Sequence, residues 1–308
     1  MGGLLDCFPI PSGAIAPAGS VTRANGKAWA DVVVKIGGSA CTRKAEFETL
    51  NVGALSAISS QLSALPAEGL SLAVVHGAGS FGHQHAKEYG VSKGSSEAPL
   101  DLSDRLREGF AKTRLSVTTL NKHVITALLK EGLPAVSISP CPFVGTEKKK
   151  LRGGRLESST LQGTKGLLQR GFVPVVHGDA VLDDAQGVAI LSGDVWMVEL
   201  CRELGAKSAV FVTDVDGVFT KPPSEPGAEL VPEILLDQKG ELELRGVSMN
   251  TASHDVTGGL KAKLESAADV LRGAPSVQAV YIVRAGSSAA AEALRGQAPK
   301  QGTTLKRR

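Results

Sequence analysis

Short apolar runs that end in glycine alternate along this chain with longer amphipathic stretches. Residues 31–35 (DVVVK) form the first run and stop at a glycine pair, and residues 72–76 (LAVVH) form the second and stop at Gly77. Runs this short, apolar and β-branched are typical of strands buried on both faces. Their alternation with helices predicts an α/β fold, a three-layer αβα sandwich around a mostly parallel central sheet.

The same patterns predict the remaining elements along the chain. Further strands are expected at 135–139, 173–177, 208–213 and 277–283, the last being the final clear strand, with a hairpin from 180–183 and 187–191. Helices are expected at 47–65, 102–130 (one helix or two), 161–170, 194–204 and 261–272. Residues 147–157 are predicted to be an exposed loop or a flexible lid, and residues 222–240 an exposed loop.

The first 30 residues lack any periodic pattern and are predicted to be a flexible tail. They contain no basic segment followed by an apolar one, so a secretory signal is not expected. Their scarcity of acidic residues leaves an organelle transit peptide as the alternative to a cytoplasmic protein. Cys7, Cys41, Cys141 and Cys201 are widely separated, which favours a reducing compartment and predicts no metal site built from cysteines.

Charge and hydropathy exclude two classes of partner. The 308 residues include 34 Lys and Arg against 31 Asp and Glu, and the basic residues gather only in short clusters such as 148–150 and the last three residues. Aromatic residues make up 4% of the chain, too few for base-stacking platforms, so no nucleic-acid partner is expected. No apolar run reaches the ~18 residues of a membrane-spanning helix, so no membrane partner is expected either.

Five predicted strand ends combine glycine with hydroxyl or charged residues. They are Lys35-Ile-Gly-Gly-Ser39, His76-Gly-Ala-Gly-Ser-Phe-Gly-His83, His177-Gly-Asp179, Ser192-Gly-Asp194 and Thr213-Asp-Val-Asp-Gly217. Ligands of open α/β sheets bind beyond the carboxyl ends of the strands. Glycine loops that lead into a helix offer free N–H groups to anions. The first two loops therefore predict sites for two phosphate-bearing ligands, or for one long one.

Two familiar nucleotide motifs do not fit this chain. The sequence has no GxxxxGK[ST], which excludes a P-loop enzyme. Residues 77–82 match GxGxxG in form, but the acid about 20 residues on, Glu97, lies in a predicted loop rather than at a strand end. A dinucleotide-dependent dehydrogenase is therefore disfavoured.

Basic side chains near these loops indicate phosphate ligands. Lys35 ends an apolar strand, where an ammonium group is unfavourable unless it meets an anion. Lys261 and Lys263 follow a glycine pair at a predicted helix start, where a cation opposes the helix dipole unless an anion lies between them. His83 begins the helix after the second loop and can donate to a phosphate.

Together with Asp255-Val-Thr-Gly-Gly259, the five motifs resemble in order the amino acid kinase superfamily, and most closely its isopentenyl phosphate kinase family of plant and algal type. The resemblance covers roughly residues 31–305, and the string from His76 to His83 is its most specific part. It implies ATP-dependent phosphorylation of isopentenyl phosphate, with dimethylallyl phosphate as a further acceptor, in isoprenoid biosynthesis. It also implies Mg²⁺ as a cofactor and a homodimer.

The resemblance assigns roles to the motif residues. Lys35, Gly37, Gly38 and Ser39 would cradle the transferring phosphates. Lys44 would stabilise the transition state, and the catalytic set would be Lys44, Lys35 and His83.

On the substrate side, Ala78 would offer its amide, His83 would hold the substrate phosphate, and Gly193 would line the site. On the ATP side the set would be Gly79, Asp214, Gly217, Gly259 and Lys263, with Lys261 as the alternative to Lys263. The implied substrate-binding lobe is about 31–170 and the nucleotide-binding lobe about 171–305.

Two departures and two alternatives accompany this resemblance. Ala78 stands where the family often has glycine, so its backbone must avoid positive φ, and Ala285-Gly286 replaces a usual Asn-Gly pair. The alternatives are another small-acid or phosphonate kinase of the superfamily, and a non-catalytic nucleotide-binding protein. The lysine set argues against the second, since a binding protein needs no transition-state lysine. His85, His123 and His254 are expected to be structural or at the surface.

Overall fold

The computed structural model describes residues 26–43, 45–245 and 258–308, with the backbone alone for 258–263. Within these ranges nine strands form one sheet in the order β11-β10-β13-β12-β9-β1-β2-β6-β3. Their bounds are β1 Val32–Ile36, β2 Leu72–His76, β3 Ala135–Ile138, β6 Val173–His177, β9 Ser208–Thr213, β10 Glu233–Leu236, β11 Leu242–Arg245, β12 Ala279–Arg284 and β13 Thr303–Arg307. The neighbours from β12 through β9, β1, β2 and β6 to β3 all pair in parallel.

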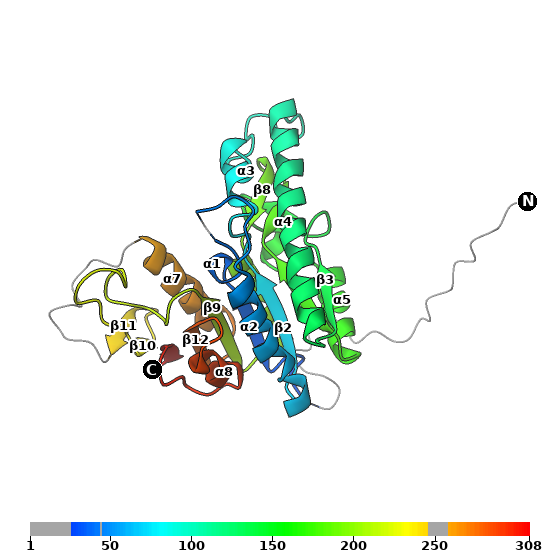
Figure 1. Ribbon diagram of the computed structural model, residues 1–308. Helices are drawn as coiled ribbons and strands as arrows, with labels where there is room; N and C mark the ends of the chain where they lie inside the picture. Colours follow the sequence, from blue (N-terminus) through cyan, green and yellow to red (C-terminus); the bar gives the residue numbers. More distant parts are fainter. Residues whose placement is uncertain (1–25, 44, 246–257) are drawn as a thin grey trace, which may run out of the picture.

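Helices cover both faces of this sheet (Figure 1). One face packs on α2 Val52–Ser63, α4 Asp104–Lys130 and α8 Ser288–Leu294, and the other on α5 Ser158–Gln169, α6 Gly193–Leu204 and α7 Gly258–Gly273. Alternate residues of each strand face opposite layers, so Val33 packs with α6 while Val34 packs with α2. The predicted three-layer sandwich is thereby confirmed.

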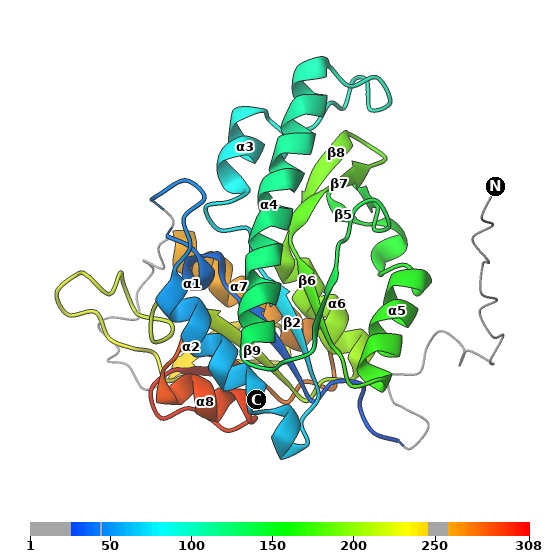
Figure 2. The same cartoon turned by 45° about the vertical axis from the view of Figure 1, so that its right-hand side comes forward.

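A smaller sheet, β5-β4-β7-β8, lies beside the large one. It consists of β4 Thr146–Glu147, β5 Lys150–Leu151, β7 Asp179–Asp183 and β8 Gly187–Leu191, so the predicted hairpin is confirmed. With α3 His83–Glu88 and the upper part of α4 it extends past the ends of the large sheet (Figure 2). These elements enclose one side of the space above the strand ends.

Four predictions of local structure need correction or refinement. Residues 102–130 hold one helix, and the helix expected from 47 begins at Val52 with Asn51 as its cap. The segment 147–157 is not an open loop: it contains β5 and a 3₁₀ helix, and Asp183 accepts hydrogen bonds from the N–H groups of Lys148 and Lys149. The predicted loop 222–240 contains strand β10.

The last predicted strand, β12, is followed by another. Residues 303–307 form β13, which lies between β10 and β12 although the sequence shows them mainly as a polar and basic tail. Leu305 and Thr303 are fully buried there. Elsewhere a short α1 (Gly38–Cys41) and a 3₁₀ helix (Pro66–Glu68) complete the fold. No helix in the described part of the chain is both long and apolar enough to cross a membrane.

Candidate active site

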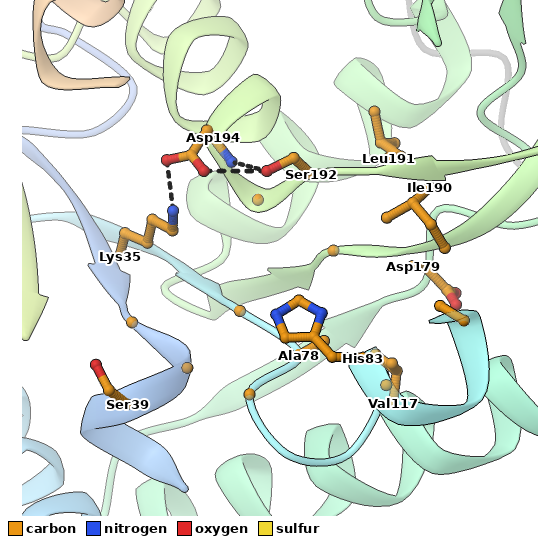
Figure 3. Close-up of a pocket in the computed structure, with 18 of the residues that line it drawn as sticks. Lys35, Ser39, Ala78, His83, Val117, Asp179, Ile190, Leu191, Ser192 and Asp194 are labelled. Atoms are coloured by element: carbon orange, nitrogen blue, oxygen red, sulfur yellow. Dashed lines mark hydrogen bonds and ion pairs between the residues drawn. The ribbon is translucent and has the colours of Figure 1, made fainter. Parts of the chain in front are cut away.

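A cleft of about 980 Å³ opens at the carboxyl ends of the parallel strands (Figure 3). Its walls are the loops after β1 and β2, the ends of β6 and β9, the beginning of α6, and parts of α3, α4 and β8. It contains eight of the predicted site residues: Lys35, Gly37, Gly38, Ser39, Ala78, Gly79, His83 and Gly193. Segments about 160 residues apart in the sequence therefore meet at one edge of the sheet, as the strand-end motifs predicted.

The two glycine loops contact one another through their backbones. A Cβ on Gly38 would lie 2.6 Å from Cα of Gly79, and one on Gly79 would lie 2.2 Å from Oγ1 of Thr42. Gly79 also has a φ of +55°, which favours glycine. Glycine is thus required at both positions by the close approach of the loops.

Thr42 joins the two loops. Its Oγ1 donates to the carbonyl of Gly38 at 2.7 Å and accepts from the N–H of Ser80 at 2.9 Å. The side chain is buried, so neither bond competes with bulk water. Sequence reasoning missed this residue, because a threonine between two motifs carries no distinctive signal.

Lys35 reaches into the cleft and pairs with Asp194. Its Nζ lies 2.5 Å from Oδ1 of Asp194, whose other oxygen accepts from the Ser192 hydroxyl at 3.0 Å (Figure 3). Desolvation works to raise the pKa of Asp194, but the charge and hydrogen bond of Lys35, with Ser266 and Ser192, hold that pKa below its ordinary value. The Asp194 carboxylate therefore stays ionised near neutral pH and holds the ammonium group of Lys35 at the strand end.

Asp194 received no role from the sequence, although the motif that contains it was singled out. Its partner Lys35 lies 159 positions earlier, so no local spacing reveals the pair. The available signal was an acid at the start of a helix that follows a strand.

Ser39 and Asp214 connect the first loop to β9. The Ser39 hydroxyl donates to Oδ1 of Asp214 at 2.7 Å, which places Asp214 beside the cleft, near the end of β9. Gly217 is not among the described residues that line the cleft: a Cβ there would meet Thr303 Oγ1 at 2.5 Å, so this glycine packs against β13. Asp214 therefore lies close to the first glycine loop, whereas Gly217 does not line the cleft.

The second loop presents Ala78 and His83 to the cleft. Among the described non-glycine residues, positive φ occurs at Glu48, Lys148 and Lys149, so Ala78 has the negative φ that its side chain requires. His83 is the first residue of α3, and its ring points into the middle of the cleft beside Ala78 (Figure 3). The arrangement places an imidazole and a glycine-loop amide on the same side of the cavity.

An apolar wall extends from this point. Ala86, Val117, Ile190 and Leu191 line it, and Gly193 leaves space because a Cβ there would lie 3.3 Å from Val75 and 3.6 Å from Cε of Lys35. Asp179 is the acidic side chain on this wall; burial raises its pKa to about 6, against the lowering effect of Arg114, whose Nε lies 3.2 Å away. A ligand with one anionic end and one hydrocarbon end fits such a cavity.

Part of the predicted site lies outside what the structure describes. Lys44 and His254 fall outside the described residues, and Gly259, Lys261 and Lys263 lie in the first turns of α7, where only the backbone is described. The rings of His85 and His123 pack on Phe47 and Phe81, which agrees with the structural or surface role expected for them.

The chain is similar in sequence to a known family of kinases. Residues 32–284 match the amino acid kinase family. The isopentenyl phosphate kinase of Arabidopsis thaliana is 34% identical over 86% of this chain and 90% of its own length. That of Methanothermobacter thermautotrophicus is 38% identical over 76% of this chain and 84% of its own.

Solved structures give the same result for the fold. A crystal structure of an isopentenyl phosphate kinase superposes with a TM-score of 0.69 at 31% identity, covering 89% of this chain and 99% of the other. An isopentenyl phosphate kinase substrate complex superposes with a TM-score of 0.69 at 27% identity, covering 90% of this chain and all of the other.

Proposed function

Because the chain belongs to the amino acid kinase family, we propose that it is an isopentenyl phosphate kinase, which transfers the terminal phosphoryl group of ATP to isopentenyl phosphate. The products are ADP and isopentenyl diphosphate, and the acceptor is a phosphate group. One observation carries the proposal. Two glycine loops contact each other in a cleft that is also lined by the Lys35 ammonium, the His83 imidazole and an apolar wall.

Phosphoryl transfer depends on positioning and charge neutralisation more than on covalent chemistry. In the proposed arrangement Lys35, Gly37, Gly38 and Ser39 hold the phosphates between which the phosphoryl group moves. Lys35 is suited to this because Asp194 and the ring of Phe211, 5.5 Å from its Nζ, hold the ammonium in place. A cation fixed before the reaction needs no reorganisation when negative charge spreads over the transferring oxygens.

The acceptor side needs no general base. A phosphate monoester is already ionised near neutral pH, so its oxygen can attack without losing a proton to the protein. In agreement, both carboxylates of the cleft are engaged, Asp194 with Lys35 and Asp179 with Arg114. We assign His83 and the Ala78 amide to the substrate phosphate, and the apolar wall to the isopentenyl chain.

On the nucleotide side, Gly79, Asp214, Gly217, Gly259 and Lys263 remain the proposed ATP contacts, with Lys44 as the transition-state cation and Lys261 as the alternative to Lys263. Mg²⁺ would be held chiefly through ATP phosphates, as is usual for this ion. The residues present fit that mode: among the described side chains no cluster of three or more His, Cys, Asp or Glu forms a metal cage, while Asp194 and Asp214 lie beside the proposed phosphate sites.

The wider predictions also stay proposals. We propose a homodimer, which sedimentation of the purified chain tests. We propose a cytoplasmic location, supported by the buried, unbridged thiols of Cys41, Cys141 and Cys201, and localisation of the tagged full chain tests it. The two-lobe division at about residue 170 is likewise proposed.

The substrate assignment is tested by coupled ADP release with four acceptors: isopentenyl phosphate, dimethylallyl phosphate, acetylglutamate and fosfomycin. We expect turnover with the first two and none above background with the others. Turnover with acetylglutamate or fosfomycin alone would favour the alternative, another small-acid or phosphonate kinase. Tight ATP binding without turnover of any acceptor would favour a nucleotide-binding protein.

A further inference from the structure

A buried histidine lies directly beneath the second glycine loop. His76 ends β2, is fully buried, and is absent from the walls of the cleft. Its Nδ1 lies 3.0 Å from the carbonyl oxygen of Gly77, and its Nε2 lies 3.0 Å from Nδ2 of Asn121 on α4. Both ring nitrogens are thus engaged, one by the loop and one by the helix.

The positions of the protons in this network follow from chemistry. A carbonyl oxygen only accepts, so Nδ1 of His76 carries a proton and donates it to Gly77. Burial, helped by neighbouring His177, lowers the pKa of His76 to about 3, so the ring is neutral and Nε2 is an acceptor. Asn121 must then present its NH₂ group to His76, and its Oδ1 accepts from the Ser137 hydroxyl at 2.5 Å.

This network fixes the direction of one peptide group. The described part of the chain has its one cis bond at Cys141–Pro142, so the Gly77–Ala78 peptide is trans, and its C=O and N–H point in opposite directions. The carbonyl points toward the α4 face, where His76 lies. The Ala78 N–H therefore points toward the opposite face, where Lys35 and Gly193 line the cleft, and it bonds to no described residue.

We propose that His76 is a positioning residue that, through the Gly77 carbonyl, aims the Ala78 N–H at the phosphate of the substrate. The identity of that substrate rests on the proposed function. The chain of hydrogen bonds runs from Ser137 through Asn121 to His76 and the Gly77 carbonyl. In this proposal only the Ala78 amide contacts the ligand. A donor fixed in this way costs no reorganisation on binding.

Two substitutions separate the two ring nitrogens. An asparagine side chain can place an N–H near the position of Nδ1, so His76→Asn keeps the donor to Gly77. A glutamine side chain reaches the position of Nε2, so His76→Gln keeps the contact with Asn121 and loses that donor. His76→Leu removes both. The matched control is His177→Leu. His177 is equally buried, stacks on His76 at 5.3 Å, and bonds to the carbonyl of Gly178. Gly178 also lines the cleft, but it leads into strand β7 and not into the loop to which the substrate phosphate is assigned.

The readouts are KM for isopentenyl phosphate, KM for ATP, kcat and melting temperature. We expect His76→Gln and His76→Leu to raise KM for isopentenyl phosphate about tenfold, roughly the effect of losing one good hydrogen bond to an anion, with KM for ATP nearly unchanged. His76→Asn should stay within about threefold of wild type, and His177→Leu should lower the melting temperature with little effect on that KM.

Equal KM values for the glutamine and asparagine variants would overturn the inference, as would a KM rise in His177→Leu as large as in His76→Leu. An unchanged KM in a folded His76→Leu would overturn it as well. Failure of the proposed function is a different result: the wild-type chain would then not turn over isopentenyl phosphate at all.

Discussion

The glycine loops after β1 and β2 lie in backbone contact, yet different groups support them. At the first loop an ion pair, Lys35 with Asp194, lines the cleft, and its charged atoms are 2.5 Å apart. Beneath the second is a neutral ring, His76, whose pKa burial lowers to about 3. A moving phosphoryl group calls for charge, whereas a bound substrate phosphate calls for fixed donors. Two similar loops thus serve two tasks because of what lies under each strand end.

The largest effect should come from removing the charge under the first loop. Lys35→Met is expected to lower kcat by about 10³-fold, because it removes a phosphate-facing cation and leaves the Asp194 carboxylate facing the phosphates. Steady-state kinetics measure this, with Asp194→Asn as the control that keeps the cation and should lose about tenfold. A kcat near wild type in Lys35→Met would contradict the claim that charge at the first loop serves phosphoryl transfer.

Lys44 gives a second test of the role of positive charge in phosphoryl transfer. Lys44→Ala should lower kcat by about 10²-fold, with both KM values changed far less, because its proposed contact forms only as the phosphoryl group passes between two anions. Initial rates at saturating and limiting substrate separate kcat from KM. A raised KM at near wild-type kcat would make Lys44 a simple binding residue.

His83 tests the second loop. His83→Ala should raise KM for isopentenyl phosphate at least about tenfold, since a charge-assisted hydrogen bond contributes ~1.5–3 kcal/mol. KM for ATP should hardly change, and His83→Gln, which keeps a donor, should lose less. Melting temperatures are the control, because a histidine that only begins α3 would lower stability and leave KM as it is.

Thr42 tests whether the loops work as one unit. Thr42→Val keeps the shape but leaves the Ser80 N–H unpaired, which should cost ~1–3 kcal/mol of unfolding free energy. The Gly38 carbonyl loses the hydroxyl and keeps its bond to the Thr42 N–H. Since the hydroxyl joins the loops, KM should rise a few-fold for both substrates. Denaturant unfolding and kinetics measure these effects, and a change in one KM alone would mean that the loops are independent.

The last prediction concerns stability against pH and not catalysis. Burial lowers the pKa values of His76 and His177 to about 3 and about 4, from 6.5. The unfolded chain therefore takes up these protons first, and the unfolding free energy should fall as pH drops from 6.5 toward 4. Asp179 acts in the opposite direction, because burial raises its pKa from 3.8 to about 6.

His177→Asn isolates one of these groups. It removes one titrating ring, so the slope of unfolding free energy between pH 4 and 6.5 should decrease by up to about 1.4 kcal/mol per pH unit. Denaturant melts across that range measure the slope. Identical slopes in the variant and wild type would mean that the ring is not held neutral.

The sequence predicted the centre of the sheet well, and its far edge poorly. Strands β1, β2, β6 and β9 are mainly apolar runs, and such a composition predicts a strand that is buried on both faces. Strand β13 reads TTLKR and β10 lies among Pro, Glu and Gly, so neither has a local pattern. Their strand character comes from pairing with one another across 70 residues.

The site divides in the same way. Glycines and Lys35 were recognisable because motif spacing and strand-end position mark them, and the fold then brings them to one cleft. Asp194, Thr42 and His76 act through partners distant in the sequence or through a backbone group, which no spacing encodes. What sequence reasoning missed is the support beneath the loops, and the two loops differ there.

The most direct test of the central claim is to observe the product. Wild-type protein is incubated with ATP, Mg²⁺ and isopentenyl phosphate, and the reaction is followed by ³¹P NMR. The account predicts that the monophosphate resonance is replaced by the two coupled resonances of isopentenyl diphosphate, with one ADP formed for each. Release of ADP with inorganic phosphate and no diphosphate, or an unchanged monophosphate resonance under conditions where acetylglutamate is phosphorylated, would contradict it.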